Sequence, residues 1–254
     1  MSRLFKALSL ALAIAALGLL GIFAASCGSS STQYRVFNAM SNPNATFAFD
    51  VTVNGGLVTP VGGLGFGSSQ PSKGYSGISS GSDTIAVYQV GTATTSGADP
   101  LVSSTLSLSG SNQYTVVLMG KSQKAPPLNL DWAAQAFPDN NALPPSGDIE
   151  FRVINAAPSL PGAVNIYIVP TLSISGATPT FTGVAYGQPS QTPTEYATLP
   201  GGQYFVYVTT STGTPLFPAP ASYNETHGIF TLVLTDVQDG FTFLTQPFLL
   251  TDVR

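Results

Sequence analysis

Short runs of apolar and β-branched residues, separated by turn-forming residues, follow one another along the chain from residue 33 onward. These runs are rich in Val, Ile, Thr, Tyr and Phe, side chains that fit a pleated and half-buried sheet surface. Apolar and polar residues alternate at 105–109, as in a strand with one face in water, whereas 204–208 is nearly all apolar. The best candidate for a helix is the short segment 131–137. The pattern therefore predicts an all-β fold.

The succession of predicted strands occurs twice. Residues 34–39 (YRVFNA) recur as 151–156 (FRVINA). Further blocks recur in the same order: 49–53 as 164–168, 66–67 as 186–187, 81–87 as 201–207, 114–118 as 230–234, and 127–130 as 247–250. Many short strands with frequent turn signals favour an antiparallel β-sandwich in each repeat, and a small barrel remains the alternative.

Proline and asparagine residues mark the boundary between the repeats. Pro138, Pro144 and Pro145 disfavour regular structure and stiffen the chain. We therefore expect a first β-sandwich at 33–132, a Pro-rich linker at 133–147 and a second β-sandwich at 148–254. A linker of this length and stiffness is expected to hold the two sandwiches end to end rather than folded together.

The N-terminus has the features of a bacterial lipoprotein signal peptide. Arg3 and Lys6 precede an apolar stretch at 7–25, and small residues lead to Cys27, the only cysteine of the chain. We expect cleavage of residues 1–26 and lipidation of Cys27, which then begins a flexible tether at 27–32. A transmembrane anchor at 7–25 is the alternative. Both predictions place the rest of the chain outside the cytoplasm.

Charge and cysteine content narrow the classes of function. Loss of Arg3 and Lys6 with the signal leaves six basic and twelve acidic residues, a net charge of −6. A mildly acidic chain lacks the basic surface of a nucleic-acid-binding protein, and it would depend on its lipid for contact with a membrane. With one cysteine the chain forms no internal disulfide, so its stability must come from hydrophobic cores.

The paired openings at 35–39 and 152–158 resemble an uncharacterised "domain of unknown function" family, often tandem, of bacterial envelope lipoproteins and secreted proteins. The start RVINAAP at 152–158 is close to the R-V-x-N-A-[AS]-P pattern of this family, and Asp50 fits its second strand, where the other repeat has Asn165. The resemblance covers 33–254. It implies an Ig-like β-sandwich in each repeat and an envelope location, and it implies no activity. The residue directly after the cysteine is Gly28 rather than an aspartate, which resembles the sorting signals of lipoproteins of the outer membrane or cell surface.

Two basic residues lie inside predicted strands. Arg35 and Arg152 must be paired with an acid or reach solvent, because an isolated charge is costly in a sheet. Each arginine could bind an anion, which would be a functional role. We favour a structural role, in which each arginine pairs with a nearby acid or with backbone carbonyls. Asp50 is a natural partner of Arg35, although the other repeat offers only Asn165. Asn38 and Asn155, which follow the two arginines, are interpreted as turn or bulge residues that bond to local backbone.

The sequence offers no recognisable catalytic or metal site. His227 is the only histidine, and no G-x-S-x-G motif presents a nucleophile. The glycine-rich segment 62–67 precedes no helix, so it indicates a loop rather than a phosphate site. Residues 236–240 favour a hairpin turn over a calcium loop. We predict no catalytic residue, no metal and no cofactor.

Aromatic residues are the remaining candidates for ligand contact. Tyr186, Tyr196, Tyr204 and Tyr207 cluster in the second repeat, and Trp132 closes the first. Tyrosine combines a large contact area with a polar tip and therefore suits recognition of a glycan or a peptide. The alternative is that these rings fill sandwich cores.

These observations predict a non-enzymatic, lipid-anchored protein of the cell envelope with two modules that bind or adhere to an envelope protein or glycan. A structural spacer or stalk is the alternative, and a hydrolase with an unrecognised site is a remote one. The predicted partners are the membrane, through the lipid on Cys27, and an extracytoplasmic ligand, with no nucleic acid.

Overall fold

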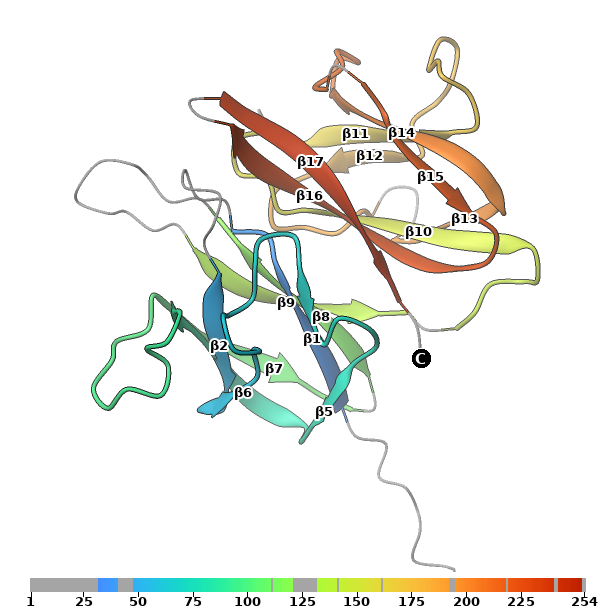
Figure 1. Ribbon diagram of the computed structural model, residues 1–254. Coiled ribbons are helices and arrows are strands. Elements are labelled where there is room, and N and C mark those ends of the chain that lie inside the picture. Colours follow the sequence, from blue (N-terminus) through green and yellow to red (C-terminus); the bar gives the residue numbers. More distant parts are fainter. Residues whose placement is uncertain are drawn as a thin grey trace, which may run out of the picture.

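The computed structural model describes residues 32–40, 48–110, 112–120, 132–140, 142–160, 162–191, 195–217, 219–239 and 242–252. In these ranges the chain is all-β with several antiparallel sheets, as the sequence predicts (Figure 1). The predicted signal peptide, Cys27 and the tether before Thr32 lie outside the described residues. Within those ranges, no helix is long and apolar enough to cross a membrane.

Residues 32–139, the N-terminal half, form two sheets. The first has the order β4-β1-β8-β9, with β5 also paired to β1, and the second has the order β3-β2-β6-β7. The strands are β1 (Thr32–Asn38), β2 (Phe49–Val53), β3 (Gly56–Leu57), β4 (Ser69–Gln70), β5 (Ser76–Ile78), β6 (Gly81–Gln89), β7 (Val102–Leu108), β8 (Gln113–Met119) and β9 (Ala133–Asp139). Strands β1 and β8 are parallel, and the other pairs are antiparallel.

Residues 148–252, the C-terminal half, follow the same pairing scheme. One sheet has the order β13-β10-β16-β17 and the other β12-β11-β14-β15, with β10 and β16 parallel. The strands are β10 (Asp148–Asn155), β11 (Val164–Val169), β12 (Phe181–Val184), β13 (Ala197–Pro200), β14 (Gly202–Thr210), β15 (Ala221–Glu225), β16 (Gly228–Asp239) and β17 (Thr242–Thr251). We call the sheets that contain β1 and β10 the inner sheets.

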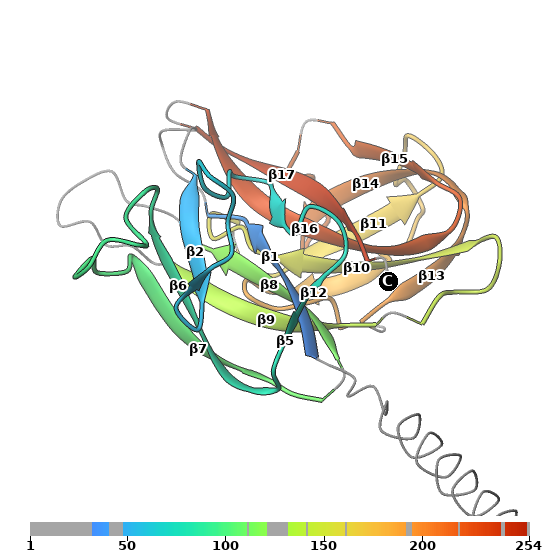
Figure 2. The same cartoon turned by 60° about the horizontal axis from the view of Figure 1, so that its bottom comes forward.

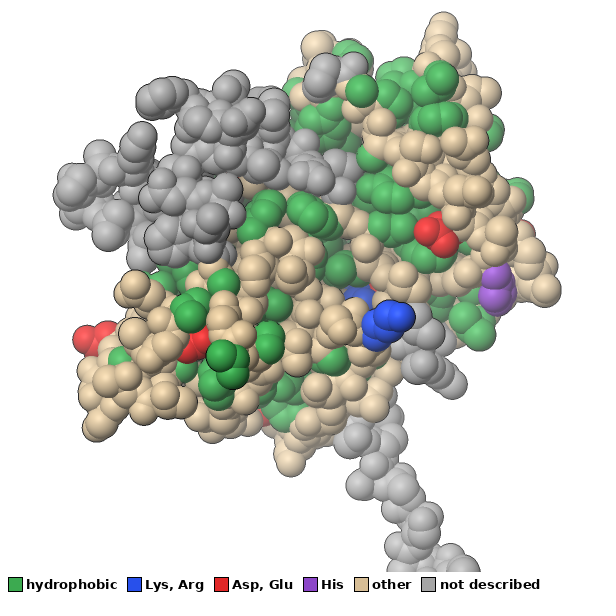
Figure 3. All heavy atoms as spheres, viewed as in Figure 1, with side chains coloured by type: hydrophobic (Ala, Val, Ile, Leu, Met, Phe, Trp, Pro, Cys, Tyr) green, Lys and Arg blue, Asp and Glu red, His purple; other side chains and the backbone are tan. Residues whose placement is uncertain are grey.

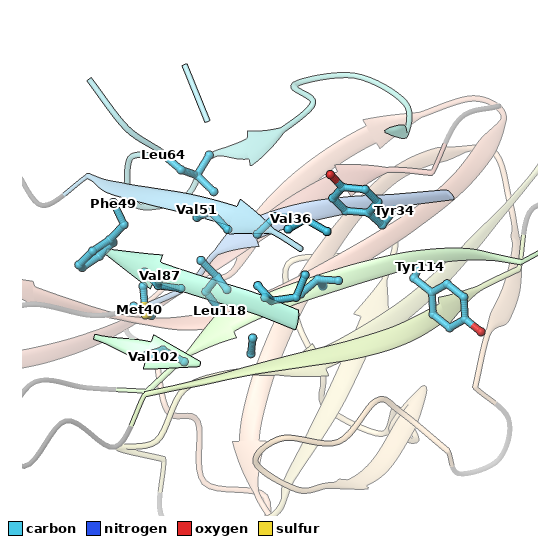
Figure 4. Close-up of a cluster of buried hydrophobic side chains, with 14 of the residues drawn as sticks. Tyr34, Val36, Met40, Phe49, Val51, Leu64, Val87, Val102, Tyr114 and Leu118 are labelled. Carbon is cyan, nitrogen blue, oxygen red and sulfur yellow. The ribbon is translucent and has the colours of Figure 1, made fainter. Parts of the chain in front are cut away.

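Alternate faces of the strands fill three hydrophobic clusters. The core of the N-terminal half lies between its two sheets and includes Tyr34, Val36, Val51 and Leu118 (Figure 4). The C-terminal half has a corresponding core. The burial pattern of β7 alternates and that of β14 has one buried face and one partly covered face, as their sequences predict.

The third cluster joins the two halves, and we call it the shared cluster. It contains Phe37 and Val117 from one inner sheet and Ile154 and Val233 from the other, all fully buried. Figures 1 and 2 show the two halves side by side. The expectation that the sandwiches stand end to end is therefore wrong. Phe37 and Ile154 point away from the core of their own half, so each inner sheet has a second apolar face that must be covered.

The linker prediction also needs correction, because residues 133–139 form β9 and not an irregular connection or a helical turn. Ala134 and Phe137 are buried in β9. The strand pairs only with β8 and lies at the edge of the inner sheet, where Pro138 needs no second hydrogen-bonding neighbour. A proline that breaks a central strand is tolerated at such an edge.

The shared cluster predicts that the two halves unfold together. Ile154→Ala should lower the free energy of unfolding by about 2–5 kcal/mol, because it opens a cavity between the inner sheets. Urea denaturation followed by fluorescence and by circular dichroism should give one transition for both proteins. Leu172→Ala, at a side chain that is 71% exposed, is the control and should change stability by less than about 0.5 kcal/mol. Two separate transitions would show that the two halves unfold independently and would contradict a stabilising role of the shared cluster.

Candidate functional site

A buried polar network crosses the interface between the inner sheets. Its first part centres on Arg35, whose neighbours Tyr34 and Val36 face the core and which therefore faces the other half. The guanidinium forms an ion pair with Asp252 and donates a 2.8 Å hydrogen bond from Nη1 to the carbonyl oxygen of Thr251. Both acceptors belong to the C-terminal half.

Arg152 makes the corresponding contacts in the opposite direction. It forms an ion pair with Asp139 and donates a 2.6 Å hydrogen bond from Nη1 to the carbonyl oxygen of Pro138, both in the N-terminal half. The side chains of Arg152 and Asp139 are completely buried. Each arginine is thus neutralised by an acid of the other half.

Two threonines close this network into a ring. Arg35 Nε donates to Thr115 Oγ1 at 2.9 Å, and Thr115 donates to Asp139 at 2.8 Å. In the same way Arg152 Nε donates to Thr231 Oγ1 at 2.9 Å, and Thr231 donates to Asp252 at 2.7 Å. The two ion pairs complete the ring: Arg35, Thr115, Asp139, Arg152, Thr231 and Asp252. We call these six residues the interface ring.

Two tyrosines cover the arginines. The Tyr75 ring lies 5.1 Å from the guanidinium carbon of Arg35, and the Tyr196 ring lies 5.2 Å from that of Arg152. Tyr75 also donates a 2.8 Å hydrogen bond to Asp139. Burial raises the pKa of the Tyr75 hydroxyl well above its usual value, and it raises the pKa of Tyr196 to about 12. Both hydroxyls are therefore protonated at neutral pH.

The two sides of the interface ring differ in charge and in openness. Glu195 lies 3.2 Å from Arg152 Nη1 and supplies a second carboxylate there. On the side of Arg35 there is instead a pocket of about 730 Å³ between the segment 67–74 and the end of β17. Arg35 and Lys73 line this pocket, and Figure 3 shows basic side chains at the junction of the two halves.

The structure explains why an arginine and an asparagine recur in the repeated segments 34–39 and 151–156. The two arginines are structural partners of acids, as favoured, but the partner of Arg35 is Asp252, while Asp50 accepts a 2.8 Å hydrogen bond from Gly91 N. Asn38 accepts from Met40 N and donates to Leu64 O, and Asn155 makes the corresponding bonds to Ala157 N and Val184 O. The bonds to Met40 N and Ala157 N are local, as predicted, whereas the bonds to Leu64 O and Val184 O reach backbone 26 and 29 residues away.

The four candidate tyrosines lie in different environments. Tyr204 is buried in the core and donates to Pro200 O, and Tyr196 covers Arg152. Tyr207 is partly buried on the other face of β14, opposite Tyr167 of β11, and Tyr186 is 41% exposed. Tyr204 and Tyr207 lie on opposite faces of β14, because alternate positions of a strand share a face, and Tyr186 and Tyr196 lie outside the strands. Ligand contact by Tyr186 or Tyr207 stays a prediction. Trp132 packs against Phe49 at 5.2 Å.

The other candidate positions have local structural partners. His227 Nδ1 lies 3.0 Å from the carbonyl oxygen of Asp148. Asp236 accepts hydrogen bonds from the amide and hydroxyl of Ser159. Segment 62–67 is a loop between β3 and β4. Among the described residues, no three His, Cys, Asp or Glu side chains are grouped so as to hold a metal ion.

The acids of the interface ring were the functional residues that sequence reasoning missed. The sequence pattern places Asp139 in the predicted linker and gives Asp252 no partner. The available signal was their position, since each lies at the end of the strand that follows the repeated 114–118 and 230–234 blocks.

Comparison with known proteins identifies a family. Residues 32–167 match the family described as "Domain of unknown function (DUF4397)". No curated protein matches the chain. Among solved structures, a streptococcal virulence factor described for α-glucan binding is 9% identical with a TM-score of 0.24, over 85% of this chain and 97% of that one. The Bacillus anthracis TIE protein is 14% identical with a TM-score of 0.20, over 81% of this chain and 34% of that one.

The interface ring predicts strong coupling between its charged members. Arg35→Met should lower the free energy of unfolding by about 3–5 kcal/mol, because it leaves the buried Asp252 carboxylate without its cation. The double variant Arg35→Met/Asp252→Leu should lose clearly less than the sum of the two single variants. Urea denaturation of the four proteins measures this coupling.

Glu195→Gln serves as the control for this cycle, because the Glu195 side chain is 38% exposed and its removal should cost at most about 1 kcal/mol. Additive losses in the double variant would show that Arg35 and Asp252 do not depend on each other.

Proposed function

We propose that this chain, which belongs to the DUF4397 domain family, is a non-enzymatic, lipid-anchored binding protein of the bacterial cell envelope. In this proposal its two halves are duplicated Ig-like modules that act as one rigid unit and present loops to an envelope protein or glycan. The corresponding strand pairings of the two halves support the duplication.

The observation that carries the proposal is the sheet-to-sheet packing of the two halves through the third cluster and the interface ring. A spacer gains length by placing modules end to end, and side-by-side packing gives up that length. A rigid core with irregular loops is the usual arrangement of binding domains. The packing therefore favours binding over the stalk alternative.

Lipidation of Cys27 would fix the orientation of this unit. Strand β1 begins at Thr32, five residues after the cysteine. Since an extended chain spans at most about 3.6 Å per residue, Thr32 would lie within roughly 18 Å of the anchor. The β1 end of the N-terminal half would then be held close to the membrane, and loops at the opposite end would face a ligand. We place the protein at the outer membrane or cell surface, with no cofactor.

The anchor and its location predict the response of intact cells to protease. Wild-type protein should be degraded when intact cells are treated, and it should fractionate with membranes, because its lipid displays it at the surface. Cys27→Ser should remove the lipidation site and release the protein from membranes. Immunoblots of both proteins before and after envelope permeabilisation give the result.

Ser31→Ala, in the predicted tether after the cysteine, is the matched control and should leave the protein membrane-bound. Membrane fractionation of Cys27→Ser equal to that of the wild type would refute lipid anchoring. Protection of the wild type until the envelope is opened would place it in the periplasm and refute surface display.

A further inference from the structure

The interface ring is asymmetric at the position next to each tyrosine. Tyr196 is preceded by Glu195, which approaches Arg152, whereas Tyr75 is preceded by Gly74, which has no side chain. Tyr75 and Tyr196 cover their arginines at nearly the same distance, so the two positions correspond in space. One side thus has two carboxylates around one guanidinium. The other has a single carboxylate, Asp252.

The side that lacks the second carboxylate carries an extra cation. Lys73 lines the pocket beside Arg35, is exposed, and forms no ion pair within the described residues. Arg35 has five N–H donors, of which three are bonded to Thr115, Thr251 and Asp252. Among the described residues that line this pocket, Arg35 and Lys73 are the charged ones, and Asp252 offsets one of the two positive charges.

The remaining lining fits a molecule that is partly apolar. The lining residues include the polar Ser69, Ser72 and Thr251 and the aliphatic Leu249 and Leu250. The pocket volume of about 730 Å³ is typical of small-molecule sites. The lining combines strands of both halves, so the interface ring holds it in a fixed shape.

We propose that this pocket binds a small organic anion. Its phosphate or carboxylate group lies between the Lys73 ammonium and the Arg35 guanidinium, and its carbon skeleton lies on Leu249 and Leu250. Charge-assisted hydrogen bonds from a lysine and an arginine are the usual means of recognising such groups. This inference rests on the proposed binding function and names a class of ligand for it.

The experiment is an NMR titration of ¹⁵N-labelled protein at constant ionic strength, with hexyl phosphate, hexanoate, inorganic phosphate and hexanol as probes. A hexyl anion should shift the amide signals of Lys73, Gly74 and Thr251. It should bind about tenfold or more tightly than inorganic phosphate, because burial of two or more methylene groups suffices for that factor. Hexanol, which has the same chain without the charge, should not shift these signals at equal concentration.

Substitutions at Lys73 test the role of its charge. Lys73→Gln should weaken binding of the hexyl anion about tenfold, and Lys73→Arg should retain it. Lys73 is exposed, so both variants should fold, and unchanged spectra elsewhere check this.

Vesicles of phosphatidylglycerol distinguish a lipid headgroup from a soluble ligand, since a headgroup ligand would broaden the same signals in their presence. The inference is overturned if neither hexyl anion binds, if hexanol binds equally well, or if Lys73→Gln binds like the wild type. None of these outcomes changes membrane anchoring or protease accessibility on cells, so failure of the inference is distinguishable from failure of the proposed function.

Discussion

The structure depends on two buried ion pairs in which an arginine of each half is neutralised by an aspartate of the other half. Arg35 and Arg152 lie in the middle of strands and are almost completely buried, and a buried charge without a partner is far too costly for a stable domain. The carboxylates that neutralise them, Asp252 and Asp139, belong to the opposite halves. Neither half can therefore satisfy its own arginine with these acids, and the interface between the inner sheets becomes part of the fold.

Several other features follow from this interface. The residues after each arginine alternate between the core of their own half, at Val36 and Val153, and the shared cluster, at Phe37 and Ile154. The next residue, Asn38 or Asn155, fixes the loop that packs against the other half. Gly67, in the loop bonded to Asn38, has a φ of +70° and so little space that an added Cβ would lie 2.4 Å from the Phe248 ring. A side chain there would be strained by the positive φ and would displace the Phe248 ring.

The sequence predicts the individual strands well because their signals are local. Alternation at 105–109 and the apolar run at 204–208 correspond to the observed burial of β7 and β14. The partners of the arginines are not local: Arg35 and Asp252 are separated by 217 residues, and no pattern within one repeat points across an interface. Strand β9 was missed because Pro138 is a strand breaker except at an edge, and the edge is set by tertiary structure. The environments of the tyrosines are also set by tertiary structure: Tyr204 and Tyr207 lie on opposite faces of β14, and Tyr196 covers Arg152 of another strand.

The interface ring and the shared cluster hold the two halves in one fixed orientation. Residual dipolar couplings of backbone amides in weakly aligned protein test it directly, because they report the orientation of each half in solution. Couplings from the described residues of 32–139 and 148–252 should fit a single alignment tensor. Two tensors of different magnitude or direction would show that the halves move independently, and would contradict a fixed orientation.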